Sequence, residues 1–162
     1  MGGHIICMGT SGSGKSTVGA ILAAQAEIPF LDADDLHSEE NKVRMAERIA
    51  LTDADRAPWL ARIREWMRTS PDAVVACSAL KRDYRDILRD GSKHVVFVHI
   101  EPPHDVLRQR MAARTNHFMG ADQLDSQLAV LEPLDDSENG FTVRNDRSPQ
   151  ETVAEILARL PS

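Results

Sequence analysis

The sequence predicts an α/β fold, a three-layer α/β/α sandwich in which helices cover both faces of a central, mostly parallel five-stranded sheet. Two observations support this fold class. Short apolar runs alternate with amphipathic stretches, and the first apolar run leads directly into a glycine-rich loop. Apolar runs bounded by turn or helix signals are typical of buried parallel strands. The predicted strands are 4–8, 28–31, 73–77, 95–100 and 141–143.

Helices are predicted where apolar residues recur every three or four positions. These stretches are 16–26, 38–50, 55–67, 81–89, 104–114 and 122–131. Ser148, Pro149 and Glu151 combine an N-cap serine, a first-turn proline and a glutamate three residues after the cap, which predicts that the last helix begins there. The 162 residues suffice for one hydrophobic core, so we expect a single domain spanning 1–162.

The charge and the composition exclude several classes of partner. The chain has 25 acidic and 19 basic residues, a net charge of -6, and no long basic run that could neutralise a nucleic-acid backbone. The residues before Gly9 contain no basic segment and too few apolar residues for a signal peptide or a membrane span. Cys7 and Cys77 lie within apolar runs, where buried reduced thiols are expected. We therefore expect a cytoplasmic protein without nucleic-acid or membrane partners.

A phosphate-binding motif follows the first predicted strand. Residues 9–16 match G-x-x-x-x-G-K-[ST], the P-loop motif, at every fixed position. Glycines allow a tight turn whose N–H groups point inward, and the following helix adds the positive end of its dipole. Lys15 is expected to reach the β- and γ-phosphates of ATP, and Ser16 to hold Mg²⁺. For Thr17, which also lies in the first turn, packing is the preferred role. The expected nucleotide contacts are Gly9, Thr10, Ser11, Gly12, Ser13, Gly14, Lys15, Ser16 and Thr17.

The segments after other strands favour a kinase over the remaining P-loop NTPase classes. Hydrolysing ATPases carry an acidic residue at the end of a later apolar strand, whereas the run 74–77 is followed by Ser78. GTPases are expected to carry an Asn-Lys-x-Asp segment, but the one Asn-Lys pair, at 41–42, continues with Val43. The small-molecule and nucleotide kinases remain as the class that fits.

Acidic residues that follow the second predicted strand suit the acceptor site of such a kinase. Alternation along an extended chain places Asp32 and Asp34 on the same side. At the carboxyl end of a parallel strand both would face the ligand crevice, with Asp32 near Mg²⁺ and Asp34 near the acceptor hydroxyl. We expect Asp34 to orient that hydroxyl and to accept its proton late in the reaction. An acidic turn that caps the next helix is the alternative.

A basic helical segment is expected to act as a lid over the nucleotide. Arg110 and Arg114 lie one helical turn apart and would neutralise charge on the transferring phosphoryl group from the side opposite Lys15. The lid is expected at about residues 108–134, where its closure would also exclude water. Solvated surface arginines are the alternative interpretation, which we prefer for Arg108.

Several further motifs resemble those of the gluconokinase family. They lie at 30–37, 53–60, 76–86, 114–119 and 126–133, and with the P-loop the resemblance covers about residues 4–133. It implies phosphate transfer from MgATP to the 6-hydroxyl of D-gluconate. It also implies a fold similar to that of shikimate kinase and a cytosolic homodimer.

The resemblance also implies which residues contact the sugar acid. The expected contacts are Asp34, His37, Arg56, Lys81, Arg85 and His117. A sugar acid needs fixed cations for its carboxylate, and either Arg56 or Arg85 would suit a bidentate clamp. Lys81 and Arg85 would lie one helical turn apart. Two departures lie beside this site, because the family usually reads Asp-Gly-Asp and His-Pro where this chain has Ala33 and Ser38.

Two alternatives stay open from the sequence. A kinase of the same fold could act on another small hydroxylated acceptor, such as shikimate, a related sugar acid or a nucleotide. A nucleoside acceptor is disfavoured because aromatic residues make up 4% of the chain and stacking needs them. A nucleotide-binding regulator without turnover is the second alternative, but a pure binder needs neither Asp34 nor Arg114.

Overall fold

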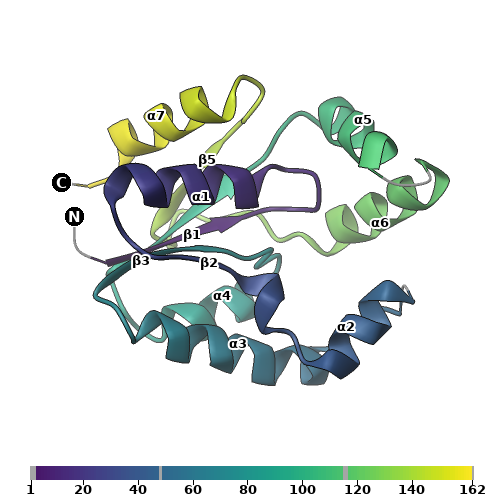
Figure 1. The fold of residues 1–162 in the computed structure, drawn as a ribbon, viewed down its shortest axis with the longest axis horizontal. Coiled ribbons are helices and arrows are strands. Elements are labelled where there is room, and N and C mark those ends of the chain that lie inside the picture. The colour runs from purple at the N-terminus through teal and green to yellow at the C-terminus, as the bar shows by residue number, and fades with distance from the viewer. Residues whose placement is uncertain (1–2, 48, 115–116, 162) are drawn as a thin grey trace.

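The computed structural model describes residues 3–47, 49–114 and 117–161, with side chains except at 114 and 117–122. Within this part of the chain, five strands form one sheet in the order β2-β3-β1-β4-β5 (Figure 1). The strands are β1 (Gly3–Met8), β2 (Phe30–Asp32), β3 (Asp72–Ala76), β4 (Val95–Ile100) and β5 (Gly140–Val143). The predicted five-stranded sheet is thus confirmed, and all of its pairings are parallel.

Helices cover both faces of the sheet, which confirms the predicted three layers. The covering helices are α1 (Lys15–Ala26) and α7 (Pro149–Arg159) on one face, and α3 (Asp53–Met67) and α4 (Arg82–Arg89) on the other (Figure 1). Side chains of β1 alternate between the two layers. Ile5 and Cys7 join the core under α1 and α7, whereas Ile6 and Met8 join the core under α3 and α4.

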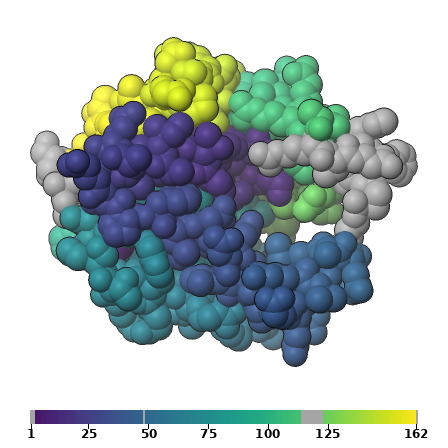
Figure 2. Space-filling model, viewed as in Figure 1, coloured from purple at the N-terminus to yellow at the C-terminus, as the bar shows by residue number. Residues whose placement is uncertain are grey.

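The remaining helical elements lie around the carboxyl ends of the strands (Figure 1). They are the short 3-10 helix η1 (Ala33–Leu36), α2 (Glu39–Ala46), α5 (His104–Arg114) and α6 (His117–Val130). α5 and α6 pack on each other around Leu107, Met111 and Leu124. In the space-filling view the surface is hollowed between α2 and the purple segment that holds the P-loop (Figure 2). The P-loop, where the sequence places the nucleotide contacts, therefore borders this hollow.

Several local predictions are confirmed. Ser148 Oγ accepts the N–H of Glu151 at 3.1 Å, so the last helix begins at the predicted cap. Cys7 and Cys77 are buried free thiols, and burial raises the pKa of each to about 12. None of the described helices is long and apolar enough to cross a membrane.

Some element boundaries differ from the predictions. β2 begins at Phe30 rather than at 28, because Glu27 ends α1 in a left-handed conformation with φ 57°. α2 ends at Ala46 rather than at 50, and α6 begins at His117 rather than at 122. Apolar spacing locates the middle of a helix, whereas its ends depend on cap geometry that the spacing does not encode.

Candidate functional site

The P-loop connects the end of β1 to the start of α1, as predicted. Gly12 and Gly14 have left-handed φ angles of 80° and 92°, and a Cβ on Gly14 would come within 2.4 Å of Asn145 Nδ2. Gly14 is the N-cap of α1 and provides no side-chain cap, so the first-turn N–H groups suit an anion. Thr10 Oγ1 is buried without a hydrogen-bond partner among the described residues. These features fit a cradle for the phosphates of ATP.

Lys15, Ser16 and Asp32 meet beside this cradle. Lys15 Nζ donates to Thr10 O at 3.4 Å, and Ser16 Oγ donates to Asp32 Oδ2 at 2.9 Å. The two side chains predicted to serve Mg²⁺ therefore lie together, and both offer oxygen, the ligand that Mg²⁺ prefers. Such a pair is sufficient because Mg²⁺ keeps several waters and binds substrate phosphates. Thr17 is exposed at the start of α1, so the packing role that we preferred for it is wrong.

Asp34 lies at the same edge of the sheet, but not for the reason that the sequence suggested. β2 ends at Asp32 and the chain turns into η1, so the alternation of a strand does not extend to Asp34. Instead, Asp32 Oδ1 accepts the N–H of Asp34 at 3.1 Å and caps the turn. Desolvation by the surrounding protein raises the pKa of Asp34, although the charge of Lys15 opposes this. A carboxylate with a raised pKa suits proton acceptance.

His37 follows η1 and is buried against α3 and α2. Its ring stacks on Trp59 with the centroids 4.1 Å apart and the planes at 12°. Asn41 Nδ2 lies 3.4 Å from its Nδ1. Burial lowers the pKa of His37 to about 4, and the charge of nearby Arg56 adds to the shift. The imidazole is therefore neutral at physiological pH and suits a hydrogen bond to a substrate hydroxyl rather than an ion pair.

Two predicted cations gather around a tyrosine. Arg56 from α3 and Lys81, the N-cap of α4, lie 5.4 and 5.5 Å from the centroid of the Tyr84 ring. Arg56 Nη1 donates to Tyr84 Oη at 3.1 Å. The Tyr84 hydroxyl donates to Asp53 Oδ1, which also accepts from Lys81 Nζ at 3.4 Å. We call Asp53, Arg56, Lys81 and Tyr84 the acceptor cluster. Sequence reasoning assigned no role to Asp53 or Tyr84, although both lie within the motifs that carry the family resemblance.

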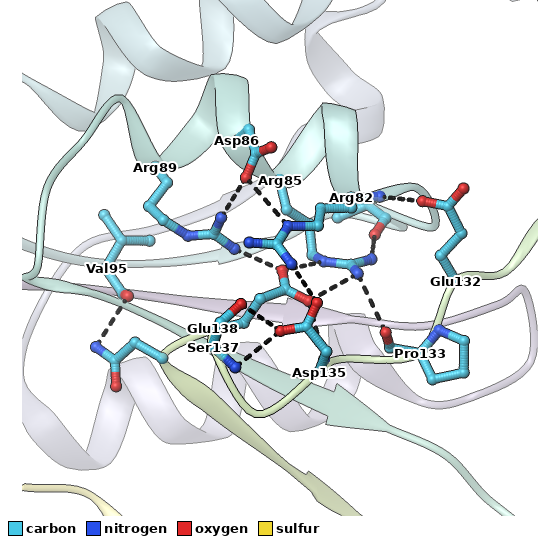
Figure 3. A network of polar contacts seen from close by, with 12 residues as sticks. Arg82, Arg85, Asp86, Arg89, Val95, Glu132, Pro133, Asp135, Ser137 and Glu138 are labelled. Atoms are coloured by element: carbon cyan, nitrogen blue, oxygen red, sulfur yellow. Dashed lines mark hydrogen bonds and ion pairs between the residues drawn. The ribbon is translucent and has the colours of Figure 1, made fainter.

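Arg85 does not join the acceptor cluster, contrary to the expectation that it faces the substrate with Lys81. Its side chain is fully buried, and its guanidinium donates to both carboxylate oxygens of Glu138, at 2.8 and 3.0 Å (Figure 3). It also donates to Ala79 O at 2.9 Å, and Arg89 donates to the same carboxylate at 2.6 Å. Arg85 therefore ties α4 to the loop before β5. The spacing of four residues predicted that Lys81 and Arg85 share one face of a helix. That prediction failed because α4 begins after Lys81, which is its N-cap.

Arg110 contacts the P-loop backbone. Its Nη1 donates to Gly12 O and Ser13 O at 3.2 and 3.3 Å, and its Nη2 donates to Asn145 O at 3.1 Å. Asn145 in turn donates to Ser13 O at 2.7 Å and accepts from the Thr152 hydroxyl at 2.8 Å. Sequence reasoning missed Asn145. The signal that could have found it is an asparagine just after the last strand, because Asn readily adopts the left-handed φ of 46° seen here.

Helix α6 also reaches the P-loop, through Gln127. Ser11 N–H donates to Gln127 Oε1 at 2.7 Å, and Gln127 Nε2 donates to Ser11 Oγ at 3.0 Å. Arg108 forms an exposed ion pair with α6 at 2.9 Å, in line with its expected role as a solvated arginine. The side chains of Arg114 and His117 lie outside the described residues, so their roles stay predictions.

Comparison with known proteins agrees with this site. The family model described as shikimate kinase matches residues 11–161. A probable gluconokinase from Mus musculus is 39% identical to this chain, in a match that covers 98% of this chain and 97% of the relative. The gluconokinase of Gluconobacter oxydans is 41% identical over 94% of this chain and 88% of its own. The crystal structure of a gluconokinase from Sinorhizobium meliloti 1021 has a TM-score of 0.88 at 44% identity, covering 96% of this chain and 90% of that chain.

These matches span the P-loop, the acceptor cluster and the α5–α6 pair together, rather than one motif. The TM-score of 0.88 shows in addition that the fold is shared with a solved gluconokinase over 96% of this chain. The chain therefore belongs to the gluconokinase family of shikimate-kinase-like P-loop kinases.

Proposed function

We propose that this chain transfers the γ-phosphoryl group of ATP to the 6-hydroxyl of D-gluconate, which yields 6-phospho-D-gluconate and ADP. One observation carries the proposal. Residues 32–37 connect a phosphate cradle to the acceptor cluster, because Asp32 accepts from Ser16 Oγ and from the N–H of Asp34, and burial and the charge of Arg56 lower the pKa of His37. The cradle, the carboxylate of Asp34 and the two cations of the cluster are three separate places. A donor phosphate, an acceptor hydroxyl and a substrate carboxylate need three such places. The gluconokinase relatives support this acceptor.

On the nucleotide side, the chain positions and neutralises phosphate. The P-loop N–H groups and Lys15 bind the β- and γ-phosphates, and Arg110, together with Arg114 of the lid, offsets charge on the transferring group. Ser16 and Asp32 would hold Mg²⁺, which would neutralise negative charge on the phosphates. Because the transition state is loose, positioning and charge neutralisation supply most of the catalysis.

On the acceptor side, the chain orients a polyhydroxy acid. Asp34 accepts a hydrogen bond from the 6-hydroxyl and takes its proton as the bond to phosphorus forms. Neutral His37 bonds to another hydroxyl, and Arg56 and Lys81 bind the carboxylate. His117 would add a contact from the lid.

The family resemblance supports the remaining parts of the proposal. We place the enzyme in the cytoplasm as a homodimer, with one domain spanning 1–162. Within it, residues of about 108–134 act as a lid that closes over ATP. Closure excludes water, which would otherwise compete with the sugar acid for the phosphoryl group.

The test is a coupled assay of ADP release with MgATP. The panel contains D-gluconate, shikimate, other sugar acids and nucleoside monophosphates, with a reaction without acceptor as the control. We expect strong turnover on D-gluconate, and phosphorus NMR of the product to place the phosphate on C6. Turnover on shikimate alone, which the matching family model makes the second candidate, would keep the kinase and replace the acceptor. ATP binding without turnover on any acceptor would contradict the proposal.

A further inference from the structure

The acceptor cluster already holds a carboxylate, that of Asp53. Its Oδ1 accepts from the Tyr84 hydroxyl and lies 3.4 Å from Lys81 Nζ, while Arg56 donates to the same tyrosine oxygen at 3.1 Å. The hydrogen bond from Tyr84, followed by that from Lys81, lowers the pKa of Asp53, so the group is ionised at physiological pH. Lys81 and Tyr84 of the acceptor cluster therefore already bind a carboxylate, and that carboxylate belongs to the protein.

The helix that Asp53 begins does not depend on this contact. The capping box of α3 is made by Thr52 and Asp55, each of which accepts the backbone N–H of the other. The side chain of Asp53 is 72% exposed. A carboxylate so open to water gains little from an ion pair, and when it turns into solvent the buried Tyr84 hydroxyl needs another acceptor, which a substrate carboxylate supplies. The contact can therefore be exchanged for another at small cost.

A sugar acid needs the donors that Asp53 occupies. Its carboxylate calls for cations and hydroxyl donors, and the other arginine considered for this role, Arg85, is buried against Glu138. That leaves Arg56 and Lys81, the two cations next to Tyr84. Two carboxylates on the same donors would repel each other, because like charges a few Å apart disfavour joint ionisation. Asp53 and the substrate carboxylate are therefore competitors for one place.

We propose that Asp53 stands in for the substrate carboxylate in the empty enzyme and is displaced when the sugar acid binds. This inference rests on the proposed function for the nature of the acceptor. The exchange replaces one carboxylate by another, so the donors of Lys81 and Tyr84 keep an anionic partner throughout. A neutral polyol has no carboxylate to compete with Asp53, so it leaves this contact in place. Asp53 is therefore a specificity-determining residue that weakens the binding of an aldonic acid but not that of the corresponding sugar alcohol.

The test uses Asp53→Asn, which removes the charge and keeps the shape. Without the competitor, KM for D-gluconate should fall by about twofold to fivefold, the range that exposed ion pairs contribute, while kcat stays the same. The preference for D-gluconate over D-glucitol in equilibrium binding should rise by the same factor, because D-glucitol has no carboxylate that competes with Asp53. Asp83→Asn is the matched control, since Asp83 is an exposed carboxylate in the first turn of α4. It should leave both quantities unchanged.

Calorimetric binding without ATP separates this inference from the proposed function. Tighter D-gluconate binding by Asp53→Asn supports the inference, and Asp53→Ser should repeat it with an unchanged unfolding midpoint. Unchanged or weaker binding overturns it, and weaker binding would mean that Asp53 contacts the substrate directly. If wild-type protein turns over another acid of the panel, that acid replaces D-gluconate in the same comparison. If it binds no carboxylate acceptor, both proposals fall.

Discussion

The nucleotide side and the acceptor side of this site are built in opposite ways. The phosphate cradle of the nucleotide side is one contiguous segment, 9–16, whose shape comes from backbone turns such as the left-handed Gly12 and Gly14. The acceptor side is made of side chains from three separate segments, with His37 after η1, Arg56 in α3 and Tyr84 in α4. A backbone-built site appears in the sequence as a fixed spacing. A site built from side chains depends on how the elements that carry them pack.

The two sides meet at the end of β2. There Asp32 accepts a hydrogen bond from Ser16 of the P-loop, and it also accepts the N–H of Asp34 in the turn that follows. Phosphoryl transfer needs the donor and the acceptor in line, so this junction fixes their relation. Variants on either side and at the junction should therefore differ in which kinetic constant they change.

The largest effect is expected at the junction, from Asp34→Asn. Loss of the proton acceptor should lower kcat by about two to four orders of magnitude, whereas ATP affinity should change little because the P-loop is intact. In wild-type protein the raised pKa of Asp34 means that kcat/KM falls with acidification at a higher pH than for an ordinary aspartate, whose pKa is 3.8. Steady-state kinetics across pH and nucleotide binding measure these quantities. Asp35→Asn is the control, and near-normal turnover in Asp34→Asn would remove Asp34 from this role.

The next largest effects are expected at Arg56 and Arg85, the two arginines that the sequence offered for binding the substrate carboxylate. Their variants should change different quantities. Arg85→Met removes one partner of a buried ion pair and should lower the free energy of unfolding by about 3 kcal/mol, the low end of such changes because Arg89 still contacts Glu138. KM for D-gluconate should stay close to the wild-type value in the folded fraction. Arg56→Met should do the reverse and raise that KM by roughly 10- to 100-fold. Urea unfolding and steady-state kinetics on both variants measure the two effects. If the Arg85→Met variant were as stable as wild type and had a greatly raised KM, Arg85 would have to be a substrate contact.

The pH dependence of stability is a second measurement of the ion pair between Arg85 and Glu138. Burial raises the pKa of Glu138, but hydrogen bonds from Arg85, from the Asp135 N–H and from Arg89 together lower it below its usual 4.5. A carboxylate with a lower pKa in the folded state stabilises the fold above its unfolded pKa and loses that effect as the pH falls through the folded value. The stability difference between wild type and Glu138→Gln should therefore be full at pH 7 and shrink below pH 4.5.

The same contrast explains what the sequence could predict. The sheet, its layers and the P-loop follow from local patterns, and their order along the chain leaves few ways to assemble them. Asp34 reached its place through η1 and not through strand alternation, because where an extended strand stops depends on the packing around it. Arg85 and Glu138 are 53 residues apart in the sequence, and no local pattern shows that they meet. Burial of a charge by a distant partner is a tertiary property.

The smallest effect should come from the contact between α6 and the P-loop. Gln127→Ala removes two partly buried hydrogen bonds to Ser11, each of which stabilises by roughly 0.5 kcal/mol, so we expect KM for ATP to rise about fivefold. KM for D-gluconate and kcat should change less, because the acceptor cluster has no part in this contact. Steady-state kinetics with each substrate varied in turn measure the split, and Gln123→Ala, an exposed glutamine one turn earlier in α6, is the control. Equal effects on both substrates would show that α6 positions the two sides together, and that the nucleotide side is less self-contained than its contiguous motif indicates.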